Sequence, residues 1–366
     1  MKTAQTVIRK DFPSISLFLL QMIAVWVFAW VLFYFLRQFG IEEYPYVELS
    51  RRPDRLLQLG IHAGIGVLTG IFYGSSELLF ERPGFQKHSY GKMILIKTAL
   101  YFVVAVVLMT AAVIATQYFR FGKPDWKKAG QWLVGANFLV ALTHFITVSM
   151  LISFIRQMNY KFGPGVLWNL LIGRYRQPRE EQRIFMFLDL RSSTAIAEKL
   201  GHVRFTRLIQ DCFFDLTEVV LRHKVDIYQY VGDEAILSWE LERGLSDNHC
   251  MHCYFDFLEV LKKRSAYYEK HYGVQPFFKA GVHLGKVMVA EVGVIKKDIA
   301  YLGDVLNTAA RIQGRCNELE QGLLISGELK EKLPADRQIH FKHMGVEILK
   351  GKQERLAIFG IEKHSE

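Results

Sequence analysis

LGDVLNTAAR, residues 302–311, places an asparagine and an arginine four positions apart in a segment with helical periodicity. The apolar pattern from Val305 to Cys316 predicts that helix. Asn307 and Arg311 then lie on one helical face. A polar amide and a guanidinium on one face can orient a ribose and stabilise a charged phosphorus centre. The segment therefore points to chemistry at phosphorus.

Two aspartates upstream stand where predicted strands end. Asp189 lies at the end of a strand that is apolar on both faces, just before a helical run whose first N–H groups can face phosphates. Asp233 lies at the tip of a hairpin predicted from strands 226–231 and 235–239. Each also has an ordinary structural role available, in a helix cap or in a turn. If the two carboxylates converge, they can bind two divalent ions that activate a hydroxyl and neutralise a triphosphate.

The pattern around these segments predicts an α+β domain of about 180 residues, with helices packed against a sheet. The expected elements, in order, are a strand at 183–190, helices through Arg222, the hairpin, a helix to Lys270, strands at 277–283 and 287–292, a strand into Leu302, the helix from Val305, and short strands that end near Gly360.

The N-terminal half is different, because it holds four apolar stretches of nearly membrane-spanning length. They are residues 14–36, 56–80, 93–118 and 131–155. Glycines at 60, 64, 66, 70 and 74 have the small-xxx-small spacing that lets helices approach closely in lipid. We therefore expect a transmembrane region of about four helices at 1–156, a juxtamembrane connector at 157–180 and a catalytic domain at 181–362.

Charge supports this division and argues against nucleic acid as a partner. Residues 1–180 hold 20 Lys and Arg against 9 Asp and Glu, whereas residues 181–366 hold 26 against 27. The excess positive charge thus flanks apolar segments, where it favours both chain ends on the cytoplasmic side. His62, Glu77, Lys97 and His144 fall inside the apolar stretches and could sense a membrane or extracytoplasmic ligand. For Glu77 and Lys97, near span ends, snorkelling is the simpler interpretation.

Five segments in order resemble the class III adenylate and guanylate cyclases. They are FLDLRSST, YVGDEAILSW, KAGVHLGKVMVAEVG, YLGDVLNTAAR and LKGKQERLAIFG, and they cover nearly all of residues 181–362. The resemblance implies a membrane-bound adenylate cyclase of bacterial type that converts ATP to cyclic AMP and pyrophosphate. It also implies two divalent ions, Mg²⁺ or Mn²⁺, at each site. A multi-pass protein of the inner membrane with a cytoplasmic catalytic domain is expected.

The resemblance assigns roles to individual residues. Asp189, Asp233 and the backbone of Leu190 would hold the metals, Asn307 would orient the ribose, and Arg311 would stabilise the α-phosphate in the transition state. The outer phosphates would be bound by Lys350, with Ser192, Ser193 and Thr194 also binding phosphate. The metal ligands would come from one chain and the other groups from its partner, so a homodimer with two sites is implied.

Base recognition departs from the family pattern. Gln229 stands where adenylate cyclases usually have a lysine, and Asp298 stands where they have an aspartate or threonine. Asp298 can accept from the adenine amine, and a Gln229 amide can donate to N1, which favours ATP. Because the pair does not fully match either type, a guanylate cyclase that makes cyclic GMP stays open.

Two alternatives belong to other classes. A diguanylate cyclase shares the Gly-Asp-Glu hairpin at residues 232–234, but it has no counterpart of the NTAAR segment. A non-catalytic membrane receptor module with a degenerate cyclase domain is supported only by Gln229. Cys250 and Cys253 form a C-x-x-C motif within a helical pattern, so buried thiols are a simpler interpretation than a metal site.

Overall fold

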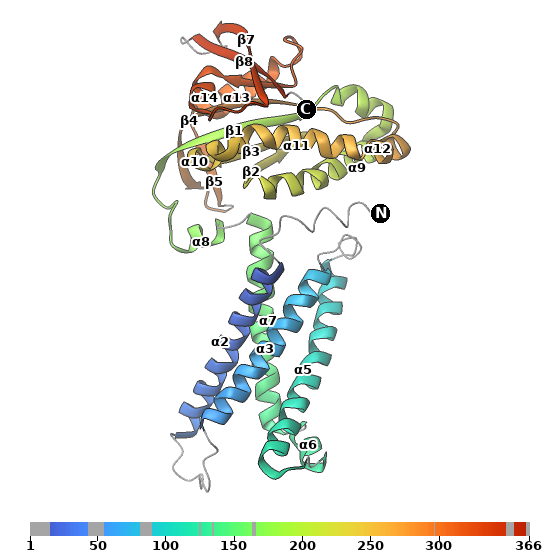
Figure 1. Cartoon of the computed structure of the whole chain (residues 1–366), viewed down its shortest axis with the longest axis vertical. Coiled ribbons are helices and arrows are strands. Elements are labelled where there is room, and N and C mark those ends of the chain that lie inside the picture. Colours follow the sequence, from blue (N-terminus) through green and yellow to red (C-terminus); the bar gives the residue numbers. More distant parts are fainter. Residues whose placement is uncertain are drawn as a thin grey trace. The chain divides into compact units, whose positions relative to one another are not determined.

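The computed structural model describes residues 15–42, 55–80, 90–123, 126–133, 135–162, 166–295, 297–348 and 355–363. The chain divides into two compact units, Met1–Gln157 and Met158–Glu366. Figure 1 labels most elements of both units.

The first unit is entirely helical in its described part. Its elements are α2 (Ile15–Glu42), α3 (Arg55–Phe80), α5 (Tyr90–Phe121), α6 (Trp126–Leu133) and α7 (Ala136–Phe162) (Figure 1). Three stretches are long and apolar enough to cross a membrane, namely Ile15–Arg37, Arg55–Phe80 and Phe138–Asn159. The predicted third stretch, 93–118, falls within α5, which is helical from Tyr90 to Phe121 and includes the apolar segment Ala99–Ala115. The expectation of an apolar helical N-terminal region is confirmed, with three helices of spanning length among the described residues.

Glycines bring α2 and α3 into backbone contact. A Cβ atom built on Gly66 would lie 2.5 Å from the Cα of Val27, and one on Gly70 would lie 2.5 Å from the Cα of Ile23. Any larger residue would force the helices apart, so these two positions bear out the small-xxx-small prediction. Among the described residues of one chain, Gly60 and Gly64 have no neighbour within 4 Å of a Cβ built at either position, so for these two glycines the close approach stays a prediction.

A carboxylate inside this helical unit is buried and paired. Glu77 is 4% exposed. Both of its oxygens accept from Lys97 Nζ at 2.9 Å, and Oε1 also accepts from the Tyr101 hydroxyl at 2.5 Å. Arg156 Nε of α7 lies 3.7 Å from Oε2. Snorkelling was therefore the wrong interpretation for Glu77, because its charge is balanced within the bundle instead of reaching water.

The second unit is an α+β domain. Its helices are α8 (Val166–Leu171), α9 (Ser193–Arg222), α10 (Leu241–Leu245), α11 (His249–Lys263), α12 (Ser265–Tyr272), α13 (Asp304–Gly314) and α14 (Gly327–Lys332), with a short 3₁₀ turn at Ser246–Asn248. Its strands are β1 (Arg179–Leu190), β2 (Asp226–Val231), β3 (Glu234–Glu240), β4 (Phe278–Val292), β5 (Asp298–Leu302), β6 (Leu323–Ser326), β7 (Ile339–Ile348) and β8 (Arg355–Lys363).

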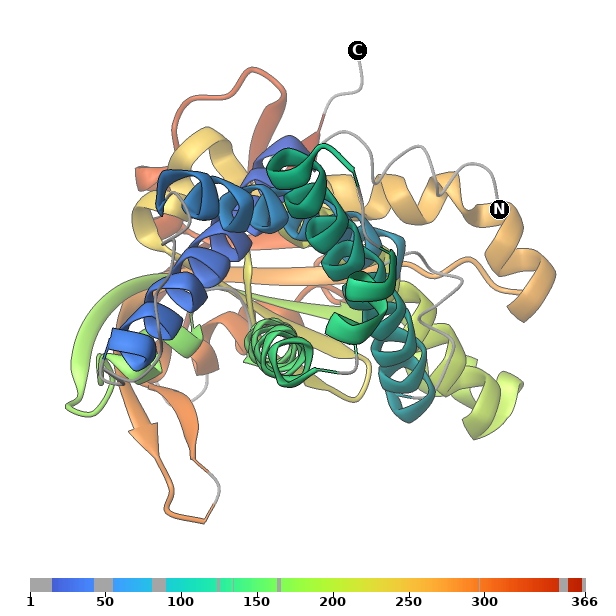
Figure 2. The same ribbon diagram turned by 90° about the horizontal axis from the view of Figure 1, so that it is seen from below.

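The strands form one sheet in the order β2-β3-β1-β4-β6-β8-β7, with β5 paired to β4. All pairings are antiparallel except that of β4 with β6. Helices cover both faces, which is why β1 is apolar on both sides as predicted. Ile184, Met186 and Leu188 face the core beneath α9 and α11, whereas Phe185 and Phe187 face the layer that contains α13. The β4–β5 hairpin projects beyond the rest of the sheet (Figure 2).

The sequence prediction divided β4 in two, and this was wrong. The strand is continuous over 15 residues, through Gly285. A Cβ on Gly285 would lie 2.5 Å from Cγ2 of Val305. This glycine therefore allows α13 to pack closely on the strand and does not mark a turn. The predicted helix to Lys270 is likewise two helices, α11 and α12, joined at Arg264.

Candidate active site

Two of the predicted carboxylates converge at the end of β1. Asp189 is paired across the sheet with Glu234 of β3 on one side and with Lys279 of β4 on the other. Asp233 precedes Glu234 in the tight β2–β3 turn, which Gly232 enters with a positive φ of 62°. Antiparallel pairing thus fixes the relative position of three acidic side chains and one lysine on a rigid scaffold.

The side chain of Asp189 is held at one oxygen. Oδ2 accepts a hydrogen bond from Nε2 of Gln313 at 2.9 Å and lies 3.2 Å from Nζ of Lys279. Gln313 is buried on α13 and Lys279 lies on β4. Both contacts are made to Oδ2, so this oxygen of Asp189 is held in place by one neutral and one charged donor.

The acidic groups influence one another electrostatically. Partial burial, together with the negative charge of Asp233, raises the pKa of Asp189, and Lys279 opposes this shift. Burial raises the pKa of Glu234 to about 7, and the charges of Asp189 and Asp233 add to the effect. The carboxyl groups of Asp189, Asp233 and Glu234 therefore lie close together, and Lys279 compensates only part of their negative charge.

Asp189 and Asp233 fit divalent cations. Oδ2 of Asp233 is buried, and within the described part of the chain no group hydrogen-bonds to it. A buried carboxylate oxygen without a donor is costly, and a cation can satisfy it. The donor set consists of hard carboxylate oxygens, which suit Mg²⁺ or Mn²⁺.

The turn between β1 and α9 carries the predicted phosphate-binding residues. Ser192 adopts a left-handed conformation, with φ of 57°, and makes no side-chain cap bond to α9. Ser193 begins that helix, and Thr194 is exposed one position later. The simple helix-cap role is therefore not used at Ser192, and its side chain does not occupy the first N–H groups of α9.

The helix predicted from the LGDVLNTAAR segment, residues 302–311, is confirmed as α13. Asn307 and Arg311 lie four residues apart on it and therefore on one helical face. Asn307 is exposed and Arg311 is half-buried. Nη1 of Arg311 is buried and has no hydrogen-bond partner among the residues that the structure describes. A guanidinium nitrogen in that state is available to an anionic ligand.

The two predicted base-recognition residues lie on separate strands. Gln229 is exposed on β2, just after an irregularity in its pairing with β3. Asp298 is exposed at the start of β5, where Oδ1 accepts from the N–H of Ile299 at 3.0 Å. Leu190 is buried and pairs with Phe278. Lys350 lies outside the described residues.

Residues 175–362 match the adenylate and guanylate cyclase catalytic domain family. The chain belongs to this family. Adenylate cyclase 2 of Rhizobium meliloti (strain 1021) is 35% identical to it over 223 residues, which cover 61% of this chain and 61% of that protein. Adenylate cyclase 1 of the same strain is 25% identical over 181 residues, or 48% of this chain and 27% of that protein. The chain thus spans less than two thirds of the length of either curated relative.

A solved bacterial light-regulated adenylyl cyclase has the same fold as the cyclase domain. The TM-score is 0.53 at 19% identity, and the match covers 63% of this chain and 67% of that one. At this identity the likeness concerns the fold alone.

Sequence reasoning missed three residues of the candidate site. Glu234 directly follows Asp233, and Lys279 opens the KAGVHLG segment, but only strand register brings both beside Asp189. Gln313 lies two positions beyond Arg311 and so on a different side of α13, the side that faces the sheet. An attempt to predict cross-strand neighbours of Asp189 could have found Lys279.

The C-x-x-C motif lies apart from these groups. Cys250 and Cys253 are both buried on α11, as the helical interpretation predicted. Burial raises the pKa of Cys250 to about 12, so the thiol stays protonated. Within the described ranges, no group of three or more His, Cys, Asp or Glu side chains is arranged to hold a metal.

Proposed function

We propose that this protein is a membrane-bound adenylate cyclase that converts ATP to cyclic AMP and pyrophosphate at a homodimer interface. The observation that carries the proposal is the convergence of Asp189 and Asp233, with a buried carboxylate oxygen of Asp233 that no described group satisfies. Both curated relatives described above bear the name adenylate cyclase, which supports the same activity.

In this proposal Asp189, Asp233 and the backbone carbonyl of Leu190 hold two divalent ions. When bound, these ions lower the pKa of the ribose 3′-hydroxyl and neutralise the triphosphate. The 3′-hydroxyl loses its proton to solvent, and its oxygen forms a bond to the α-phosphorus while the bond from that phosphorus to the β-phosphate oxygen breaks, so that pyrophosphate leaves with that electron pair. Arg311 stabilises the charge that develops on the α-phosphate, and Asn307 orients the ribose. Ser192, Ser193, Thr194 and Lys350 bind the other phosphates.

ATP is the proposed substrate because Asp298 offers an acceptor for the adenine amine. Gln229 can donate its amide to adenine N1, although it lacks the charge that a lysine would bring. Guanylate cyclase activity is the second candidate, because the neutral Gln229 favours neither base by charge.

The proposed homodimer follows from where the other groups lie. Gln229, Asp298 and Asn307 are exposed in a single chain, whereas the metal-binding carboxylates are partly buried. Apolar side chains on β2 beside Gln229 are also exposed, including Tyr230 at 44% and Val231 at 48%. Such apolar exposure next to polar site residues is typical of a surface that another chain covers.

The apolar helices of the first unit would anchor the protein in the inner membrane as a multi-pass bundle, with the cyclase domain in the cytoplasm, where ATP is present. The ion pair between buried Glu77 and half-buried Lys97 is a feature that a simple anchor does not require. We propose that the bundle dimerises and sets the placement of the two catalytic domains, in response to a ligand in the membrane or outside the cell.

Product analysis tests the activity. Purified full-length protein is incubated with Mn²⁺ and either ATP or GTP, beside Asp233→Asn and beside Glu242→Gln as a matched exposed-carboxylate control. Cyclic AMP from wild type and from Glu242→Gln, with a loss of at least about a hundredfold in Asp233→Asn, is the expected result.

Other outcomes are equally decisive. Cyclic GMP as the main product would replace the ATP assignment by GTP. No cyclic product from either nucleotide would refute catalysis and favour a receptor module. Co-expression of Asp233→Ala and Arg311→Ala chains tests the shared site, because random pairing should restore about a quarter of wild-type activity if each site draws on two chains. No recovery would refute the shared site.

A further inference from the structure

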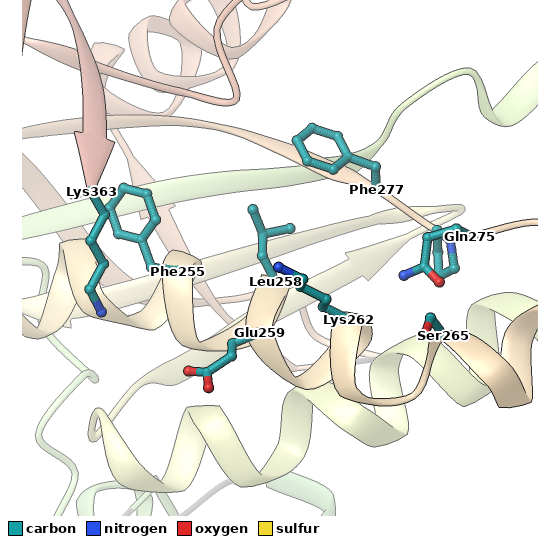
Figure 3. A pocket seen from close by; sticks show the side chains of 9 residues that line it. Phe255, Leu258, Glu259, Lys262, Ser265, Gln275, Phe277 and Lys363 are labelled. Carbon is teal, nitrogen blue, oxygen red and sulfur yellow. The ribbon is translucent and has the colours of Figure 1, made fainter. Parts of the chain in front are cut away.

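The catalytic unit carries a groove that the proposed chemistry does not use. Its volume is about 620 Å³, and it is bounded by α11, Ser265 of α12, the segment before β4 and the end of β8. Figure 3 shows its lining side chains. The volume lies within the range of about 300–1,000 Å³ that is usual for small-molecule sites.

The floor of the groove is apolar and is supported by the core. Phe255 and Leu258 of α11 are half-buried and pack against the main hydrophobic cluster of the domain. Phe277 forms the facing wall and is 41% exposed. In Figure 3 its ring stands across the groove from α11. Because the core holds the floor in place, the groove is preformed.

The rim of the groove carries uncompensated positive charge. Lys262 and Lys363 both line it, and neither has a carboxylate partner in the described part of the chain. The Lys363 ammonium lies 5.9 Å from the centre of the Phe255 ring. The acidic lining residue Glu259 is already paired with Lys263, which lies outside the groove, at 2.7 Å. Two ammonium groups above an apolar floor complement an anion with an apolar body.

The groove is connected to the turn that carries the metal-binding backbone. The carbonyl of Phe277 accepts a hydrogen bond from the N–H of Arg191 at 2.9 Å, and Phe278 pairs with Leu190. From the α11 side, the Tyr254 hydroxyl donates to the Phe278 carbonyl at 3.0 Å. A ligand that shifts Phe277 thus acts on a residue hydrogen-bonded to the β1–α9 turn.

We propose that this groove binds an amphipathic monocarboxylate, with its apolar or aromatic body on Phe255, Leu258 and Phe277 and its carboxylate at one of the two rim lysines, Lys262 or Lys363. Occupancy alters the position of the β1–α9 turn and thereby the rate of cyclisation. Only this second part rests on the proposed cyclase function.

Binding is measured first, by saturation-transfer NMR with 4-phenylbutanoate on the full-length protein in lipid nanodiscs, after subtraction of empty nanodiscs. The neutral 4-phenylbutan-1-ol is the probe control. The test variant is Lys262→Gln/Lys363→Gln, and the matched variant is Lys270→Gln, an exposed lysine of α12 that does not line the groove. We expect saturable binding of the anion that weakens about fivefold to tenfold in the double variant and is unchanged in Lys270→Gln.

Three results would overturn the binding site: no saturable signal above empty nanodiscs, equal affinity for the alcohol, or equal weakening in Lys270→Gln. Activity is measured second, as cyclic-product formation with and without saturating 4-phenylbutanoate. A change of twofold or more in wild type that is absent from the double variant supports the link to the turn, and an unchanged rate refutes it. Because binding is read without catalysis, an inactive protein would refute the proposed function and leave the groove tested on its own.

Discussion

Replacing Arg183 by methionine tests how the catalytic sheet holds its site strands in place. Arg183 is 2% exposed on β1. Its guanidinium donates to Asp226 at 2.6 Å, to Glu181 at 3.1 Å and to Ser238 at 2.9 Å. Asp226 begins β2, the strand of Gln229, and Ser238 lies on the neighbouring β3. The guanidinium also lies 4.9 Å from the ring centre of Tyr301 on β5, the strand that Asp298 begins.

The expected loss follows from these contacts. A hydrogen bond that involves a charged group contributes about 1.5–3 kcal/mol. We take the lower value for Asp226, because its side chain is 38% exposed and water screens the pair. Glu181 is 13% exposed. With the lower value for Glu181 and Ser238 as well, the three bonds of the charged guanidinium contribute about 4.5 kcal/mol. Methionine recovers part of the packing, so we expect Arg183→Met to cost about 3 kcal/mol.

Hydrogen exchange of the full-length protein measures this loss locally, in peptides from β1 and β4. A loss of about 3 kcal/mol corresponds to exchange about a hundredfold faster at the most protected amides. Arg243→Met is the matched control, because Arg243 also approaches Asp226, at 3.6 Å, but is 42% exposed. We expect less than about 1 kcal/mol from that exposed pair. Equal effects of the two substitutions would refute the reasoning, since burial would then not decide the contribution.

Three further predictions use other contacts. Gly281→Ala would bring a Cβ to 2.2 Å from the backbone nitrogen of Gln313 and displace α13. We expect this variant to lose about 1–3 kcal/mol of stability and to have a lower kcat. The control is Gly314→Ala, because no neighbouring atom lies within 4 Å of a Cβ built at that position. Glu77→Gln leaves the Lys97 ammonium without its carboxylate partner, so we expect the solubilised protein to lose about 3 kcal/mol of stability in thermal unfolding. An unchanged Tm would contradict the pairing. Burial opposes ionisation of Asp256, but hydrogen bonds from neighbouring basic side chains lower its pKa to about 2. At pH values above the ordinary pKa of 3.8, this depressed pKa contributes about 2 kcal/mol to folding stability, and the contribution is lost as the pH falls to about 2. The difference in stability between wild type and Asp256→Asn should therefore disappear between pH 3.8 and about 2. A difference that does not change with pH would refute this assignment.

Much of the fold could be predicted because its signals are local. The β2–β3 hairpin and α13 begin and end within about two residues of the predicted positions. The long apolar stretches likewise predicted the N-terminal helices. The continuous β4 could not be predicted, because Gly285 looks like a turn signal until Val305 is known to pack against it. A glycine's role in close packing depends on a partner distant in sequence.

The candidate site divides in the same way. Asp189 and Asp233 were identifiable because each stands at a strand end beside a turn, a position that local pattern reveals. Lys279 and Gln313 contact Asp189 only through sheet register and helix packing, which the linear pattern does not contain. The burial of Glu77 was missed for a related reason, because its partners Lys97 and Arg156 come from other helices.

The distribution of satisfied and unsatisfied groups explains why the proposed site needs a second chain. Gln313 of α13 and Lys279 of β4 hold Asp189, so the proposed metal-binding corner is preorganised within one chain. In contrast, Asn307 is exposed on α13, and Arg311 keeps a buried nitrogen without a described partner. Because the half-site in each chain is already ordered on folding, association of two chains needs little further conformational entropy to complete the site. The cyclisation rate should then depend on how two catalytic units meet, which makes chain association the natural point of control for an N-terminal helical bundle.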